Sequence, residues 1–242
     1  MNPLERFHSL VTAATVVIMF GVLVFLPRFT DGHAVTALMA PIIALLGSPC
    51  IYRALSWSLA LTLKRLRLLR SCLLGPSYIE GTWVGYNLIS HEELHLVVEI
   101  VDQDLNNVTL KGESYDVEGQ FLARWHSVSV GLDVTNARLI YAYSCDSVQP
   151  REKVIKGIAE FDLYRKSKFS RMTEMRGLVA DLRTYARKEA IEVKVSNSPL
   201  DHLEAIKLAK SYATNATSHR NSLNDQHGNC DSIPVSRSAT LK

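Results

Sequence analysis

The chain has almost no excess charge of either sign. Its 242 residues carry 27 Lys and Arg against 24 Asp and Glu, a formal net charge of +3. A protein that grips duplex DNA or another nucleic-acid polymer through its phosphates needs a strong basic excess. The composition therefore argues against a polymer-binding protein, although it leaves open the recognition of a small ligand.

Cysteine is scarce and follows no pairing pattern. The four cysteines lie at positions 50, 72, 145 and 230, far apart in the chain. This spacing suits neither a disulfide framework nor a metal site, and scattered free thiols are typical of a reducing compartment. We expect no metal and no cofactor.

Two segments near the N-terminus contain no charged residue, Ser9 to Leu26 and Ala34 to Tyr52. Each is long enough to cross the hydrocarbon core of a bilayer as a helix. A cleaved signal peptide would need a basic start, a shorter apolar stretch and a small-residue cleavage site, which this segment lacks. We predict a transmembrane hairpin over residues 1–63, with spans at about 9–26 and 34–56.

The distribution of charge beside these spans predicts their orientation. No acidic residue occurs between Asp31 and Glu80, whereas basic residues gather after the second span, at Arg53, Lys64, Arg65, Arg67 and Arg70. Basic clusters next to a span mark its cytoplasmic side. We therefore expect both termini inside the cell, with residues 64–76 as a basic juxtamembrane linker.

Beyond Tyr78 the pattern changes to short segments rich in β-branched and aromatic residues, separated by turn residues. We predict eight antiparallel strands, which close into a lipocalin-like β-barrel over residues 77–197. Residues 172–182 also suit a helix. The predicted strands are 80–89, 94–102, 108–115, 121–131, 138–145, 154–165, 176–184 and 189–196.

Several of these strands alternate apolar and polar residues. In one strand Leu94, Leu96, Val98 and Ile100 share a face opposite His95 and Glu99; in another, alternate residues from Ile155 to Leu163 share a face. An antiparallel sheet places such an apolar face over its core. We therefore expect His95 and Glu99 to point away from the core.

The last part of the chain, residues 198–242, is predicted to be a helix followed by a disordered tail. Ser198 resembles a helix N-cap and Pro199 a first helical residue, with the helix running to about Ala213. Beyond Thr214 the chain is polar, with few apolar residues, which is typical of disorder.

One short motif suggests a different chemistry. Residues 91–95, His-Glu-Glu-Leu-His, match the H-E-x-x-H signature of zinc proteases, which requires a helix so that both histidines bind one ion. The β-branched residues that follow favour a strand, in which the two imidazoles lie too far apart. We treat the match as accidental, with a zinc hydrolase using Glu92 as the lesser alternative.

The strand region resembles a known family. The segment 79–86, IEGTWVGY, enters its first strand as a lipocalin-like barrel does, and VTLKGESYDVEGQFLARWHSVSVGLDVTNARLIYAYSCD (108–146) followed by KGIAEFDL (156–163) continues the pattern. Joined to a membrane hairpin, this order is similar to the two-transmembrane, β-strand-rich effectors of bacterial cyclic-oligonucleotide antiphage defence (CBASS). The resemblance covers roughly residues 9–196 and lies in architecture rather than in a diagnostic motif.

This resemblance implies a function without catalysis. A cytoplasmic barrel would bind a cyclic di- or trinucleotide made by a partner nucleotidyltransferase. The bound form would assemble into a homo-oligomer in the bacterial inner membrane, disrupt its lipid and kill the infected cell. No other cluster of Asp, His or Ser suggests an acid–base or nucleophilic site. A membrane-tethered lipocalin-like carrier of an apolar molecule is the alternative from another class.

Recognition of a small dianion needs a few cations and aromatic faces. Arginine binds phosphate and aromatic rings stack on bases. Arg124 alternates away from Trp125, which suits an exposed charge, and Trp125 also suits a core position. The predicted ligand-binding residues are Arg124, Trp125, Tyr141, Tyr143, Arg151 and Lys153.

Overall fold

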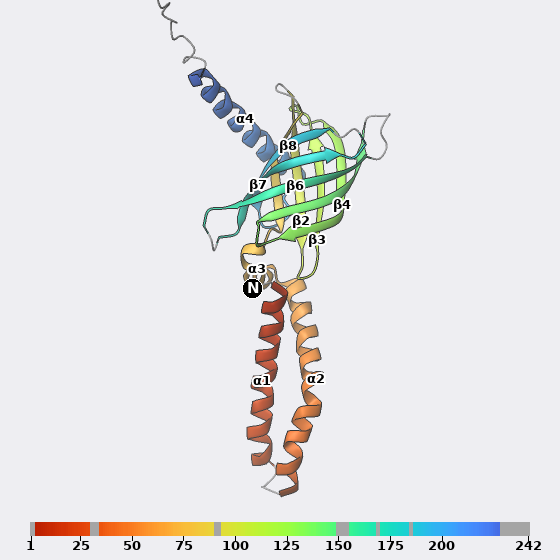
Figure 1. Ribbon diagram of the computed structural model, residues 1–242, viewed down its shortest axis with the longest axis vertical. Helices are drawn as coiled ribbons and strands as arrows, with labels where there is room; N and C mark the ends of the chain where they lie inside the picture. The colour runs from red at the N-terminus through yellow and green to blue at the C-terminus, as the bar shows by residue number, and fades with distance from the viewer. Residues whose placement is uncertain are drawn as a thin grey trace, which may run out of the picture. The chain divides into compact units, whose positions relative to one another are not determined.

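The structure is a computed structural model that describes residues 3–29, 34–89, 93–148, 155–167, 170–183 and 186–227. The chain divides into two compact units. One comprises residues 1–79 with the segments 102–108 and 165–172, and the other comprises the remainder. Figure 1 shows the helices of the first unit and the barrel of the second.

The first unit is built on a pair of long helices, α1 (Pro3–Phe29) and α2 (Ala34–Arg65), which pack side by side and antiparallel (Figure 1). Phe7, Val11 and Leu63 form the buried contact between the two helices. Pro27 does not end α1, which continues to Phe29, and α2 runs through residues 47–49 without a break.

The outer surface of this helix pair is apolar. Val17 and Phe20 of α1 are 70% and 67% exposed, and Leu45 and Trp57 of α2 are both exposed by about the same fraction. Among the described residues, one helical segment, Pro3–Phe25, has the length and hydropathy of a membrane span. A signal sequence has the same properties. Of the two predicted membrane spans, the described part of the structure therefore supports one apolar helix.

The predicted basic linker contains short helices, α3 (Arg67–Leu74) and η1 (Gly75–Ser77). The side chain of Gln103 is buried in the same unit, where it accepts a hydrogen bond from the Ile79 amide (2.8 Å) and donates one to the Ser77 carbonyl (2.9 Å). Arg171 donates to the hydroxyl of Ser71 at 3.0 Å. These bonds fix the chain just before the first strand.

The second unit is a closed barrel in which eight antiparallel strands follow one another in chain order and β1 pairs with β8 (Figure 1). Closure leaves no sheet edge unpaired. The strands are β1 (Gly81–Leu88), β2 (Leu94–Gln103), β3 (Val108–Tyr115), β4 (Phe121–Asp133), β5 (Arg138–Ser147), β6 (Ile155–Arg165), β7 (Met172–Asp181) and β8 (Arg187–Ser196).

The eight predicted strands are confirmed, with boundaries displaced by a few residues. The largest difference is at β7, which begins at Met172 and not at Arg176, and the helical alternative for this segment is wrong. Met172 and Met175 are both buried. Their spacing of three residues suits a helix on paper, but pairing with β8 defines an extended strand.

The prediction of which face of β2 points inward is wrong. Leu96 and Val98 lie on the outside of the barrel and pack under α4, whereas Glu99 is 1% exposed and points into the lumen. In β1, Val84 and Tyr86 likewise face the helix. Because a helix covers this side of the barrel, both faces of β1 and β2 are buried, and the apolar face is the outer one.

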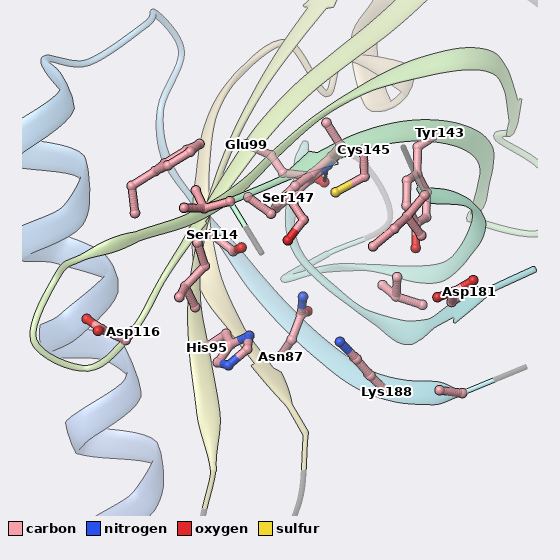
Figure 2. Close-up of a pocket in the computed structure, with 18 of the residues that line it drawn as sticks. Asn87, His95, Glu99, Ser114, Asp116, Tyr143, Cys145, Ser147, Asp181 and Lys188 are labelled. Atoms are coloured by element: carbon pink, nitrogen blue, oxygen red, sulfur yellow. Dashed lines mark hydrogen bonds between the residues drawn. The ribbon is translucent and has the colours of Figure 1, made fainter. Parts of the chain in front are cut away.

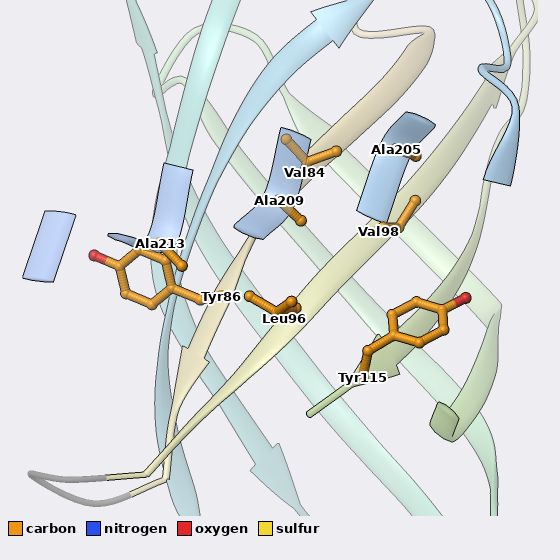
Figure 3. Packing of buried hydrophobic residues seen from close by; sticks show 8 residues of the cluster. All are labelled: Val84, Tyr86, Leu96, Val98, Tyr115, Ala205, Ala209 and Ala213. Atoms are coloured by element: carbon orange, nitrogen blue, oxygen red, sulfur yellow. The ribbon is translucent and has the colours of Figure 1, made fainter. Parts of the chain in front are cut away.

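The helix α4 (His202–His227) provides this cover. Ala205, Ala209 and Ala213 recur at every fourth position and pack on the outer face of the barrel (Figure 3). The small side chains allow the helix to lie close to the strands.

The start and end of α4 differ from the prediction. Its N-cap is Asp201, whose carboxylate accepts a hydrogen bond from the Leu203 amide at 3.2 Å, and not Ser198. The helix does not end at Ala213 but continues through the polar segment to His227. The rest of the predicted tail, residues 228–242, lies outside the described residues.

Candidate functional site

The barrel encloses a cavity of about 770 Å³, a size suited to a ligand of several rings. Side chains from most of the strands point into it (Figure 2). Its acidic lining residues are Glu93, Glu99, Asp116, Asp181 and Glu192, against one lysine, Lys188, and one histidine, His95, among the described residues. The described lining is therefore acidic.

Glu99 joins two of the aromatic residues that line the cavity. Its Oε1 accepts hydrogen bonds from the indole N–H of Trp125 at 2.9 Å and from the hydroxyl of Tyr141 at 2.5 Å. Its Oε2 is buried and has no hydrogen-bond partner among the described residues. One oxygen of this carboxyl group thus holds the aromatic residues in place, and the other is unsatisfied.

Glu192 is a second buried carboxyl in the lumen. It is 1% exposed, and its Oε2 also lacks a partner within the described part of the chain. Strand β1 lies between the two acids: Trp83 pairs with Glu99 in β2, and Gly85 pairs with Glu192 in β8. A Cβ at Gly85 would lie 1.9 Å from the Ile191 carbonyl oxygen and 2.8 Å from Cγ of Glu192, so glycine allows this close approach of β8 to β1.

Burial changes the acidity of both groups. Removal from water raises the pKa of Glu99 to about 7, because the hydrogen bonds from Tyr141 and Trp125 offset only part of this effect. Burial, together with the negative charge of Glu99, raises the pKa of Glu192 well above its ordinary value. Near neutral pH the pair therefore retains at least one proton, and the lumen is less negative than its composition implies.

Two glycines make room for the aromatic side chains. A Cβ at Gly112 of β3 would lie 2.2 Å from the ring of Trp125, and one at Gly157 of β6 would lie 2.2 Å from the ring of Tyr143. Tyr141 stacks on Phe161 with ring centroids 6.1 Å apart. The aromatic lining is thus held by close packing as well as by hydrogen bonds.

The structure brings together three of the six predicted ligand-binding residues. Trp125, Tyr141 and Tyr143 all line the lumen. Arg151 and Lys153 lie outside the described residues, although Val148 and Ile155, on either side of that segment, both line the cavity.

Arg124 does not join them. It alternates away from Trp125, has a side chain that is 68% exposed, and binds Oε1 of Glu113 through Nε at 2.7 Å. It lines a separate outer pocket of about 540 Å³. Arg124 therefore does not line the lumen, because adjacent residues of a strand face opposite sides of the barrel, and its contact with a ligand stays a prediction.

Glu113, the ion-pair partner of Arg124, lies beside the start of α4. Its carboxylate also accepts a short hydrogen bond from Tyr115 and lies 3.3 Å from His202. Partial burial alone would raise the pKa of Glu113, but the hydrogen bonds from Tyr115 and Arg124 and the nearby positive charge lower it instead. Arg124 and His202, the first residue of α4, thus share Glu113 as a partner.

Sequence analysis missed Glu99, Glu192 and Lys188 as lining residues. Glu99 lies between Val98 and Ile100, and Glu192 lies between Ile191 and Val193. A single acid within a β-branched run is the available signal. For Glu99, alternation alone points away from the core, because an alternating strand usually exposes its polar face.

The last two residues of the zinc-protease motif, Leu94 and His95, belong to a strand. His91 and Glu92 lie outside the described residues, while His95 belongs to β2. The Ile89 amide donates to the Glu93 carbonyl at 2.9 Å, a bond that joins the two arms of the β1–β2 hairpin. Within the described ranges, no group of three His, Cys, Asp or Glu side chains is placed to hold a metal. The strand lacks the helical geometry that this zinc chemistry needs.

A carrier of apolar molecules would need an apolar cavity. Val179 and Ile155 line the cavity with apolar side chains, but Asn87, Glu99 and Glu192 line it with polar groups. Burial of unsatisfied carboxyl oxygens against a hydrocarbon ligand is unfavourable. The lining therefore suits a ligand that carries both a ring and hydrogen-bonding groups.

Comparison of the chain with protein-family models, with curated proteins and with solved structures gave no significant match.

Proposed function

We propose that this protein is a membrane-anchored receptor whose barrel binds a cyclic di- or trinucleotide in its lumen. The observation that carries the proposal is the barrel cavity of about 770 Å³ with Trp125, Tyr141 and Tyr143 in its wall. Flat aromatic side chains beside hydrogen-bonding groups are the usual means of holding an unpaired nucleobase. No catalytic step is part of the proposal.

The charge of the lining constrains how such a ligand binds. A phosphate diester is anionic, and the described lining has more acids than cations. The raised pKa values of Glu99 and Glu192 reduce this repulsion because the pair keeps a proton near pH 7. In the proposal the bases enter the lumen and Lys188, with His95, accompanies the phosphates.

The helical unit supports the membrane part of the proposal. Large apolar side chains such as Val17, Phe20 and Leu45 are exposed on both helices. Exposed apolar surface of this extent is characteristic of a membrane or protein interface. We propose that α1 and α2 both cross the inner membrane, with the barrel in the cytoplasm, and that ligand-driven assembly of these hairpins damages the bilayer.

The decisive experiment is calorimetric titration of the full-length protein in lipid nanodiscs with a panel of cyclic di- and trinucleotides. At least one compound is expected to bind with a micromolar or lower Kd. Trp125→Ala should weaken that binding at least about tenfold, since base stacking contributes about 1–3 kcal/mol per base. Trp57→Ala in α2, where the indole is 71% exposed, is the matched control and should bind as the wild type does. Failure of every cyclic nucleotide to bind would refute the proposal.

Membrane damage is tested separately with dye-loaded vesicles of phosphatidylethanolamine and phosphatidylglycerol. The bound nucleotide should release dye from vesicles that contain the wild-type protein. Val17→Asp places a charge within the apolar segment, at a cost of about 2.5–3.5 kcal/mol for insertion, and should reduce membrane association. Val128→Asp in β4, where the side chain is 68% exposed, is the control. A mature protein that lacks α1 would instead identify this helix as a cleaved signal sequence.

A further inference from the structure

The two buried carboxyls in the lumen require an explanation beyond barrel stability. A buried polar atom without a partner costs about 1–3 kcal/mol. Here Oε2 of Glu99 and Oε2 of Glu192 both have this status among the described residues, although each side chain is 99% buried. Folding alone would be served better by apolar side chains at these positions.

The hydrogen bonds of Glu99 leave its second oxygen available to a ligand. Trp125 and Tyr141 both donate to Oε1, which holds the carboxyl group in one orientation. Oε2 is not used by either donor, and Glu99 is one of the residues that line the cavity. The indole and phenol rings border that cavity, so a planar ligand that contacts them lies beside the carboxyl group that they hold.

Glu192 brings the second unsatisfied oxygen to the same wall. It approaches across β1 beside Gly85, where no side chain stands in its way, and its acidity responds to the charge of Glu99. When the pair holds one proton, one carboxyl presents an acceptor and the other an O–H donor. The edge of adenine or cytosine matches both groups, because it places an exocyclic amino donor beside a ring-nitrogen acceptor.

Resting on the function proposed above, we infer that Glu99 and Glu192 form a base-reading site that selects a nucleobase with an exocyclic amino group, such as adenine or cytosine. The amino group donates to Oε2 of Glu99, whose ionised form Trp125 and Tyr141 stabilise, and the adjacent ring nitrogen accepts from the protonated carboxyl of Glu192. A base with a carbonyl oxygen in place of the amino group sets an acceptor against the Glu99 acceptor. The site therefore rejects it.

The test uses two pairs of uncharged nucleosides that differ at this group, adenosine against inosine and cytidine against uridine. Titrated into the full-length protein in nanodiscs, the amino member of each pair should bind at least about tenfold more tightly, since the carbonyl member leaves the buried acceptor of Glu99 unpaired. This comparison uses the wild-type protein and does not depend on the folding of any variant.

Substitution then assigns the preference to the two acids. Glu99→Gln keeps an oxygen for Trp125 and Tyr141 and places an amide N–H₂ toward the ligand, so it should abolish or invert the preference. Glu192→Gln should reduce it. Glu189→Gln, an exposed neighbour in β8, is the matched control and should preserve it. Far-UV circular dichroism verifies that each variant retains the barrel.

The outcomes separate this inference from the proposed function. If cyclic nucleotides bind but the amino preference is absent, or survives both Gln substitutions, the base-reading site is refuted and the receptor function stands. If nucleosides show the preference while no cyclic nucleotide binds, the receptor function fails and the site stands. If spermidine binds in place of nucleosides and is lost in Glu99→Gln, the acids form a cation site and the inference is wrong. If nothing binds, both are overturned.

Discussion

The buried acid Glu99 makes barrel stability depend on pH in a direction opposite to that of an ordinary ion-paired carboxylate. Because its pKa is about 7 in the folded protein and near 4.5 when exposed, the folded state holds this proton more tightly than the unfolded chain does. The stabilisation is complete below pH 4.5 and is lost as the pH rises through 7. We therefore expect the wild-type barrel to be less stable at pH 8 than at pH 5.

The size of the effect follows from this change in pKa. It corresponds to about 3 kcal/mol of unfolding free energy for Glu99 alone, or roughly 6–12 °C in the unfolding midpoint for a protein of this size. Glu99→Gln removes the ionisation and keeps an acceptor for Trp125 and Tyr141. The variant should lose the part of the pH dependence that Glu99 contributes. Glu192, whose pKa burial also raises, acts in the same direction and leaves the remaining slope.

The assay is denaturation of the full-length protein in detergent, followed by tryptophan fluorescence at pH 5, 6, 7 and 8. Wild type and Glu99→Gln are expected to differ little at pH 5 and most at pH 8, where the variant is the more stable. Glu189→Gln removes an exposed carboxyl of β8 and should follow the wild-type curve. A wild-type stability that is constant or increases from pH 5 to 8, or a variant with the wild-type slope, would refute the reasoning.

Two further predictions concern the packing and the thiol of the lumen. Gly112→Ala places a methyl group against the ring of Trp125 and should lower the unfolding free energy by about 1–3 kcal/mol through overpacking. The control Gly131→Ala in β4, where the nearest atom to the new methyl group is 3.8 Å away, should be nearly neutral. Equal midpoints of the two variants in thermal unfolding would contradict this prediction. Burial raises the pKa of Cys145 to about 11, so about one thiol in a thousand is ionised at pH 8. Iodoacetamide should therefore label Cys145 far more slowly than the exposed Cys72, as followed by mass spectrometry. Comparable labelling of the two cysteines would contradict this prediction and show that the reagent reaches the lumen.

Local sequence information was sufficient to predict the strands and the apolar N-terminal helix. β-Branched runs separated by turn residues give strand limits close to those observed, as at β3, which spans Val108–Tyr115 in both the prediction and the structure. Backbone geometry and the lack of charge act over a few residues, so a single segment carries the information. The second apolar run is helical as expected, but its role as a span remains a prediction.

The candidate site could be predicted only in part, because it depends on which face of each strand points inward. Trp125, Tyr141 and Tyr143 were found from their aromatic character, but Arg124 was grouped with them despite facing outward. Glu99 was assigned to solvent. Alternation along a strand indicates that its two faces differ, but it does not indicate which face points into the cavity.

What the sequence by itself determined is therefore the order and type of the elements: an apolar N-terminal helix, a second helix and eight consecutive strands. Only the tertiary structure decided that α4 covers β1 and β2, and this cover reverses their faces. Once Leu96 and Val98 are buried under the helix, Glu99 must point into the lumen, where it meets Glu192 from a strand more than ninety residues away. Such a meeting depends on barrel closure and has no signal in either strand alone.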